Sequence, residues 1–298
     1  MVSSDCFRSL VKKINMNILT FDIEDWWVYD RYRIGEKSDW RPRLDGYLNR
    51  ILDLLDERNI KATFFILGEV AKCSPEIVKQ ICQKGHHIGC HSFSHIFLGK
   101  ATPEQVMEDT KKAIETIENV IGRKVDAYRA PAFSITEKNS WILSVLLENG
   151  IKYDCSIFPA TRSYGGFPSY KTKVPSIIEV KGEMIKEFPI APVQIFGHEI
   201  VYSGGGYFRL FPYIKIKSFV EQNDYVMTYF HIKDFDYAQK KTYRSFEGES
   251  ALSRYIKKYY GLKNCFPKFC RLVSQFDFVS VEQADKLLDW NQQPYIKL

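Results

Sequence analysis

Short apolar segments alternate with amphipathic segments along most of this chain. Patterns typical of buried strands lie at residues 17–22, 62–67, 87–91, 125–129, 152–157, 184–190, 225–231 and 278–281. Patterns typical of helices, in which apolar side chains recur every three or four residues, lie at 48–55, 74–85, 102–121, 137–149, 212–222, 250–260 and 282–288. Strands that alternate with helices in this way form either an open doubly wound sheet or a barrel of parallel strands.

Polar residues at the ends of the predicted strands favour the barrel. Asp22, His91, Arg129, Asp154 and His231 each fall at or just past the carboxyl end of a different strand. Side chains from five strands converge most easily when the strands close into a barrel, whereas a doubly wound sheet gathers ligands at one crevice. We therefore predict an α/β fold, a distorted (β/α) barrel of parallel strands with fewer than eight regular units.

The predicted elements form one domain over residues 16–298. Residues 1–15 are polar and lack the apolar centre of a secretion signal, so we expect a disordered or tag-like extension there. Residues 161–206 are rich in Gly, Pro and Tyr, and we interpret them as a loop-rich insertion. No apolar run reaches about 18 residues, so we expect no stable membrane insertion.

Charge and cysteine content favour a cytoplasmic enzyme. The formal net charge of +6 is spread along the chain, and no basic stripe or aromatic RNA-binding signature is present, so a nucleic acid partner is not expected. The seven cysteines have no zinc-finger spacing and no disulfide pattern, which favours reduced thiols and a cytoplasmic location. No pattern predicts an oligomeric state.

The spacing of two histidines indicates a metal site. His91 and His95 are four residues apart and can face one way on a helical turn, where they can bind one divalent metal. A carboxylate at the end of the strand at 17–22 can be the third ligand and leave one position for water. Strand alternation favours Glu24 and a turn favours Asp25, so both remain candidates. Zinc suits such ligands, and cobalt or nickel also fits. The alternative is a pair of partly buried histidines bonded to backbone.

Five motifs occur in a fixed order between residues 17 and 236. They are Thr-Phe-Asp-Ile-Glu-Asp at 20–25, His-Ser-Phe-Ser-His at 91–95, Arg-Ala-Pro-Ala-Phe at 129–133, Tyr-Asp-Cys-Ser at 153–156 and Tyr-Phe-His at 229–231. This series resembles the polysaccharide deacetylase family, the nodulation-type group of carbohydrate esterases. The displaced acid pair of the first motif, and a Gly-Gly-Gly-Tyr-Phe-Arg run at 204–209, resemble the subgroup that acts on bacterial surface polysaccharide or peptidoglycan.

The resemblance implies roles for individual residues. Asp22 would be the catalytic base, Arg129 would hold Asp22, His231 would be the acid, and Asp154 would hold the His231 ring. His91, His95 and Glu24 or Asp25 would bind the metal. Substrate contacts would come from the third motif and from the glycine-rich run, at Pro131, Phe133, Tyr207 and Arg209. The three glycines themselves could cradle a phosphate, although a substrate-facing or plain hairpin loop is the favoured interpretation.

The function implied is removal of an acetyl group from an acetylated amino sugar. The expected substrate is a bacterial cell-envelope polysaccharide, or its lipid-linked or nucleotide-linked sugar precursor. Two alternatives stay open, namely hydrolysis of a non-sugar amide and sugar binding by a catalytically dead protein on the same scaffold. The departures that keep the second alternative open are the displaced acid pair and the Ile-Lys pair at 232–233, where the family often has proline.

Overall fold

The centre of the protein is a nine-stranded sheet, seen in the computed structural model, which describes residues 15–24, 44–161, 165–239 and 250–298. The strands follow the order β12-β2-β3-β4-β5-β6-β8-β7-β13. They are β2 (Thr20–Ile23), β3 (Thr63–Ile66), β4 (His87–Cys90), β5 (Ala127–Tyr128), β6 (Tyr153–Asp154), β7 (Ser176–Val180), β8 (Glu183–Glu187), β12 (Phe230–His231) and β13 (Tyr295–Lys297).

Parallel pairing dominates this sheet. Every neighbouring pair is parallel except β7 with β8, which form an antiparallel hairpin. The carboxyl ends of seven successive strands, from β12 to β8, therefore lie at one edge of the sheet. The predicted parallel α/β fold is confirmed. In the described parts of the chain no ladder joins β12 to β13, so the hydrogen-bonded sheet is not closed there.

Two smaller strand pairs complete the sheet structure. β1 (Met16–Ile18) pairs in parallel with β11 (Tyr225–Met227), and these strands lead into the paired strands β2 and β12. β9 (Val193–Ile195) and β10 (His198–Ile200) form an antiparallel hairpin. The strand predicted at 278–281 is reduced to one bridge between Val279 and Ile18. The stretch 161–206, predicted as a loop-rich insertion, contributes β7 and β8 to the central sheet. Of the extension expected at residues 1–15, residues 1–14 lie outside the described residues.

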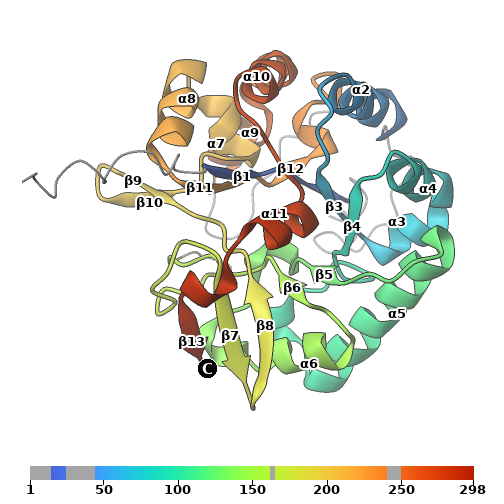
Figure 1. Ribbon diagram of the computed structural model, residues 1–298. Helices are drawn as coiled ribbons and strands as arrows, with labels where there is room; N and C mark the ends of the chain where they lie inside the picture. Colours follow the sequence, from blue (N-terminus) through green and yellow to red (C-terminus); the bar gives the residue numbers. More distant parts are fainter. Residues whose placement is uncertain (1–14, 25–43, 162–164, 240–249) are drawn as a thin grey trace, which may run out of the picture.

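Several helices pack on the outer face of the sheet, and most coincide with the predicted amphipathic segments (Figure 1). They are α2 (Leu44–Glu57), α4 (Pro75–Gln83), α5 (Pro103–Ile121), α6 (Ile142–Glu148), α8 (Tyr213–Gln222), α9 (Ala251–Tyr259) and α11 (Val281–Leu287). Three were not predicted, namely α3 (Gly68–Cys73), α7 (Gly205–Leu210) and α10 (Leu262–Gln275). Pro267 lies inside α10 and Gly205 begins α7, and both residue types disfavour helix in a propensity argument. None of the described helices is both long and apolar enough to span a membrane.

Strand alternation separates an apolar outer face from a functional inner face. In β2, Phe21 and Ile23 belong to the cluster that packs against the helices, and the Phe21 ring stacks on Phe64 with centroids 4.9 Å apart. Asp22 and Thr20 face the opposite way, toward Arg129. The same period of two therefore builds the core and directs polar side chains to one place.

Gly68 brings α3 against the loop that follows β4. A Cβ at this position would lie 2.5 Å from Cδ2 and 2.9 Å from Cα of Phe93. The backbone N–H of Gly68 also donates to the carbonyl oxygen of Ser92 at 2.9 Å. The absence of a side chain thus fixes the position of the segment between His91 and His95.

We predict that Gly68→Ala lowers the free energy of unfolding by about 1–3 kcal/mol, because the added methyl group overpacks this contact. The control is Gly46→Ala in α2, where a Cβ would meet nothing within 4 Å. That substitution should raise stability by about 0.5–1 kcal/mol, since alanine favours helix over glycine. Urea denaturation measures both changes, and equal stability of Gly68→Ala and the parent protein would contradict the prediction.

Candidate functional site

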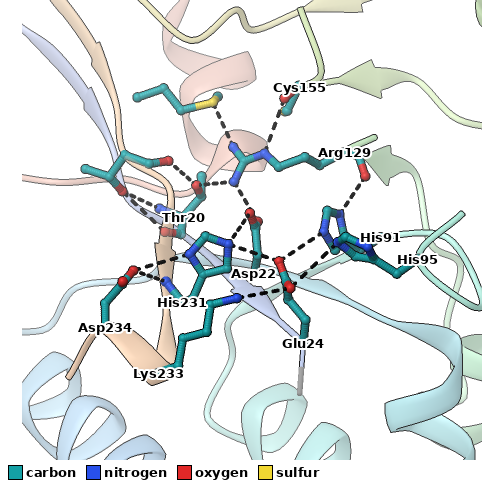
Figure 2. A network of polar contacts seen from close by, with 12 residues as sticks. Thr20, Asp22, Glu24, His91, His95, Arg129, Cys155, His231, Lys233 and Asp234 are labelled. Atoms are coloured by element: carbon teal, nitrogen blue, oxygen red, sulfur yellow. Dashed lines mark hydrogen bonds and ion pairs between the residues drawn. The ribbon is translucent and has the colours of Figure 1, made fainter. Parts of the chain in front are cut away.

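Four of the five strand-end residues, all except Asp154, converge at the carboxyl edge of the sheet, as Figure 2 shows. Asp22 lies on β2, and Glu24 follows directly after this strand. His91 follows β4, Arg129 follows β5, and His231 ends β12. Because these strands are parallel and adjacent in the sheet, side chains far apart in sequence meet within one polar network.

Glu24, His91 and His95 form a potential metal-binding group. One carboxylate oxygen of Glu24 lies 3.6 Å from Nε2 of His91, and the other lies 3.6 Å from Nε2 of His95. The three candidate ligand atoms lie within 4.8 Å of one another. Of the two acids left open by the sequence, Glu24 lies in this group, whereas Asp25 lies outside the described residues.

The histidine loop is not the helical turn that the spacing suggested. Ser92 and His95 have φ angles of 65° and 59°, so the chain turns through left-handed conformations. Asp109 on α5 stabilises this turn, because its carboxylate accepts from the backbone N–H groups of Phe93 and Ser94 at 2.7 and 3.2 Å. The two imidazoles are close together, as predicted. Their proximity results from the hydrogen bonds to Asp109 and from the close packing at Gly68, and not from a helical turn.

Arg129 holds Asp22 in a fully buried ion pair. Its Nη1 donates to Oδ1 of Asp22 at 2.8 Å and to Oγ1 of Thr20 at 2.7 Å, while Nε donates to the carbonyl oxygen of Cys155 at 3.2 Å. The guanidinium group also lies 4.2 Å from the Phe65 ring centroid. Charge-assisted bonds in a buried site are strong and directional, so Asp22 is held in one orientation.

His231 lies between two acidic groups. Its Nε2 is 2.9 Å from Oε1 of Glu24 and 3.8 Å from Oδ2 of Asp22, and its Nδ1 is 3.2 Å from Oδ2 of Asp234. Burial and the nearby Lys233 lower the pKa of His231, but the carboxylates of Glu24 and Asp234 outweigh them and raise it to about 9. The ring is therefore an imidazolium at neutral pH in this arrangement.

Asp154 does not hold the His231 ring, so that prediction was wrong. Four strands separate β6, which carries Asp154, from β12 in the sheet order. Asp154 is instead the ladder partner of Glu187 on β8, and its carboxylate accepts from the Ser156 hydroxyl. Burial raises the pKa of Asp154 to about 6. Burial and the adjacent Asp154 raise the pKa of Glu187 well above its usual value, so Glu187 holds the proton of this pair.

The residues predicted to contact substrate differ in their exposure. Pro131 and Phe133 are buried beside the site, and the Phe133 ring lies 5.5 Å from that of Tyr229 and 5.7 Å from the Arg129 guanidinium group. Tyr207 is 42% exposed. Arg209 is not a surface contact, because it is only 6% exposed and its guanidinium group pairs with Asp234. The prediction that Arg209 contacts substrate was therefore wrong, because this side chain pairs with Asp234 inside the protein.

Two further polar residues at the site were not predicted. Lys233 places Nζ 3.3 Å from Oε2 of Glu24. Burial opposes ionisation of Glu24, but Lys233, His231 and His95 together lower its pKa well below the usual value. Asp234 is three residues after His231, a spacing that places its carboxylate against the His231 backbone N–H in a short 3₁₀ turn, η4 (Ile232–Asp234). The acid at this spacing is the signal that sequence reasoning overlooked.

Comparison with known proteins relates the two halves of the chain to two family models. Residues 12–153 match the family model described as polysaccharide deacetylase, and residues 155–286 match a domain of unknown function (DUF3473). Over 109 residues the chain is 36% identical to a peptidoglycan-N-acetylglucosamine deacetylase of Bacillus cereus, covering 37% of this chain and 39% of that protein. Over 110 residues it is 31% identical to the peptidoglycan-N-acetylmuramic acid deacetylase PdaA of Bacillus subtilis, covering 35% of this chain and 42% of that protein.

The matched part is less than half the length of these curated relatives. A likeness in fold extends further. The crystal structure of a putative polysaccharide deacetylase from Mycobacterium smegmatis superposes with a TM-score of 0.65 at 18% identity, covering 97% of this chain and 96% of that one. The family match lies on the segment that carries Asp22, Glu24, His91, His95 and Arg129. Residues 12–153 of the chain thus form a polysaccharide deacetylase domain.

Proposed function

We propose that this protein is a metal-dependent hydrolase that removes acetyl groups from an acetylated amino sugar of a bacterial cell-envelope glycan or its lipid-linked or nucleotide-linked precursor. The observation that carries the proposal is the convergence of an arginine-bound carboxylate, a histidine between two acids and a Glu-His-His group in one buried network. The two deacetylases named above support the choice of substrate class.

The Glu-His-His group fits a divalent cation. Nδ1 of His91 donates to the carbonyl oxygen of Arg129 at 2.7 Å, which leaves Nε2 with its lone pair toward Glu24. This Nε2 is buried and has no hydrogen-bond partner among the described residues. Ligand atoms around a tetrahedral zinc lie about 3.4 Å apart, close to the 3.6 Å between Glu24 and each imidazole. The 2.9 Å between Nε2 of His231 and Glu24 is shorter than this spacing and is a direct hydrogen-bond distance. His231 is therefore not assigned as a metal ligand.

The reaction we propose is attack of water on the acetyl carbon. A bound divalent cation supplies a Lewis acid that polarises the acetyl carbonyl and lowers the pKa of water. Asp22 accepts the proton of the attacking water, and Arg129 keeps this carboxylate oriented. The C–N bond of the amide then breaks, giving acetate and a free amine.

His231 supplies the proton that the leaving amine needs. Its Nε2 faces the space beside Glu24 and Asp22, while Nδ1 is directed at Asp234. A proton donor at this place raises the rate because an amine anion is a poor leaving group. A catalytically dead sugar-binding scaffold is disfavoured, because the base, the acid and the potential ligands are all present in one network.

Removal of one imidazole should greatly weaken metal binding. We predict that His91→Ala weakens zinc affinity more than about 100-fold, because a three-ligand site loses one ligand and its backbone anchor. The control is His198→Ala at an exposed position on β10, which should bind zinc like the parent protein. Isothermal titration of the metal-stripped protein measures both, and equal zinc affinity of all three proteins would refute the assignment.

Neutralising the proposed base should greatly reduce turnover without weakening metal binding. For Asp22→Asn we expect acetate release from acetylated glucosamine oligomers to fall by about 100-fold or more, with zinc affinity close to that of the parent. Asp53→Asn, an exposed change on α2, should leave the rate unaltered. Full activity of Asp22→Asn, or acetate release by the parent protein that a chelator does not inhibit, would exclude the mechanism.

A further inference from the structure

The His231 ring is held by residues from the second half of the chain. Asp234 lies in η4, and Arg209 lies in α7, both within the segment that matches the domain of unknown function. We propose that Arg209 and Asp234 are positioning residues that fix the His231 ring for proton donation, and that this is the contribution of α7 and η4 to the reaction. The inference rests on the proposed function, since it assigns a role within that acid step.

The two carboxylate oxygens of Asp234 have different partners. Oδ2 accepts from the backbone N–H of His231 at 3.0 Å and lies 3.2 Å from Nδ1 of the same residue. Oδ1 pairs with Nη1 of Arg209. A carboxylate bound on both sides cannot rotate without breaking one of these contacts, so the ring plane and the direction of Nε2 are determined together.

The Arg209 guanidinium group is itself anchored to the backbone. Nε donates to the carbonyl oxygen of Tyr260 at 3.3 Å, and Nη2 donates to that of Lys258 at 3.2 Å. Both carbonyls lie at the end of α9, so this helix end helps to hold Arg209 against Asp234. The planar fork of arginine suits three separate acceptors, which lysine cannot reach at once.

Glycines place α7 close enough for this contact. A Cβ on Gly204 would lie 2.1 Å from the carbonyl oxygen of Tyr229, and Gly205 has a φ angle of 55°. Tyr229 is two residues before His231, so α7 begins close to His231 in the structure. At the other end of α7, Nζ of Lys268 donates to the carbonyl oxygens of Phe208 and Arg209 at 2.8 and 3.0 Å. The glycine-rich run thus begins a helix that packs closely against Tyr229, and it is not the predicted hairpin loop.

This arrangement has a consequence that depends on the leaving group. Asp234 accepts from Nδ1–H and directs Nε2 toward Glu24 and Asp22, where the leaving group departs. An amide needs the proton of His231, whereas 4-nitrophenolate is a stable anion and leaves without one. Loss of ring orientation should therefore slow amide hydrolysis and spare hydrolysis of the aryl ester.

The experiment compares N-acetylglucosamine oligomers with 4-nitrophenyl acetate, using zinc-loaded Asp234→Asn, Arg209→Gln and Arg209→Lys. We expect kcat on the amide to fall about 100-fold for Asp234→Asn and about 10-fold or more for Arg209→Gln. On the ester, chelator-sensitive turnover should change less than about threefold. Guanidinium ion at millimolar concentration should restore part of the amide activity of Arg209→Gln. The matched control is Arg271→Gln, an exposed arginine over the Tyr213 ring.

Two measurements separate positioning from simple damage to the fold. Thermal denaturation and zinc affinity identify a variant that has lost its structure, and Arg209→Lys retains the buried charge if Arg209→Gln does not fold. Nitrogen NMR of the His231 ring should report Nδ1–H hydrogen-bonded in the parent and altered in Asp234→Asn. Equal losses on amide and ester, or an unaltered ring spectrum, would overturn the inference. Absence of turnover on both substrates by the parent protein would instead refute the proposed function.

Discussion

Two buried carboxylates on the same side of one strand end determine the organisation of this site. Asp22 and Glu24 are 3% exposed each, and burial of an uncompensated negative charge is strongly unfavourable. The surrounding structure compensates each acid differently. Arg129 pairs with Asp22 and leaves it fixed, whereas imidazoles and Lys233 surround Glu24. The first acid is suited to accept a proton, and the second to bind a cation.

Both halves of the chain take part in this compensation. The segment up to β5 supplies the two acids, the histidine loop and Arg129, and the later segment supplies His231, Lys233 and Asp234. The parallel register of β12 against β2 places His231 opposite Asp22, so the proposed acid and the proposed base meet through backbone pairing. A site divided in this way depends on the whole sheet, since neither half alone brings these two side chains together.

The sequence predicted the alternation of strands and helices and the strand-end residues, because these follow from local periodicity and from parallel strands that share an edge. The Asp22–Arg129 pair was implied by the resemblance to the polysaccharide deacetylase family. The sequence did not predict the partner of His231. The contact between Arg209 and Asp234 spans 25 residues and depends on how closely α7 packs against Tyr229. Asp154 was misassigned because its role was carried over from the resemblance, whereas its neighbour is decided by strand order. The turn between His91 and His95 was missed because it depends on Asp109 from another helix.

The most direct test of this account is a crystal structure of the protein soaked in zinc, with data collected at the zinc absorption edge. We expect one anomalous peak bound by Nε2 of His91, Nε2 of His95 and the Glu24 carboxylate. A crystal that binds zinc elsewhere, or not at all, with these three side chains unaltered, would contradict the central claim that the buried acid after β2 serves to hold a cation.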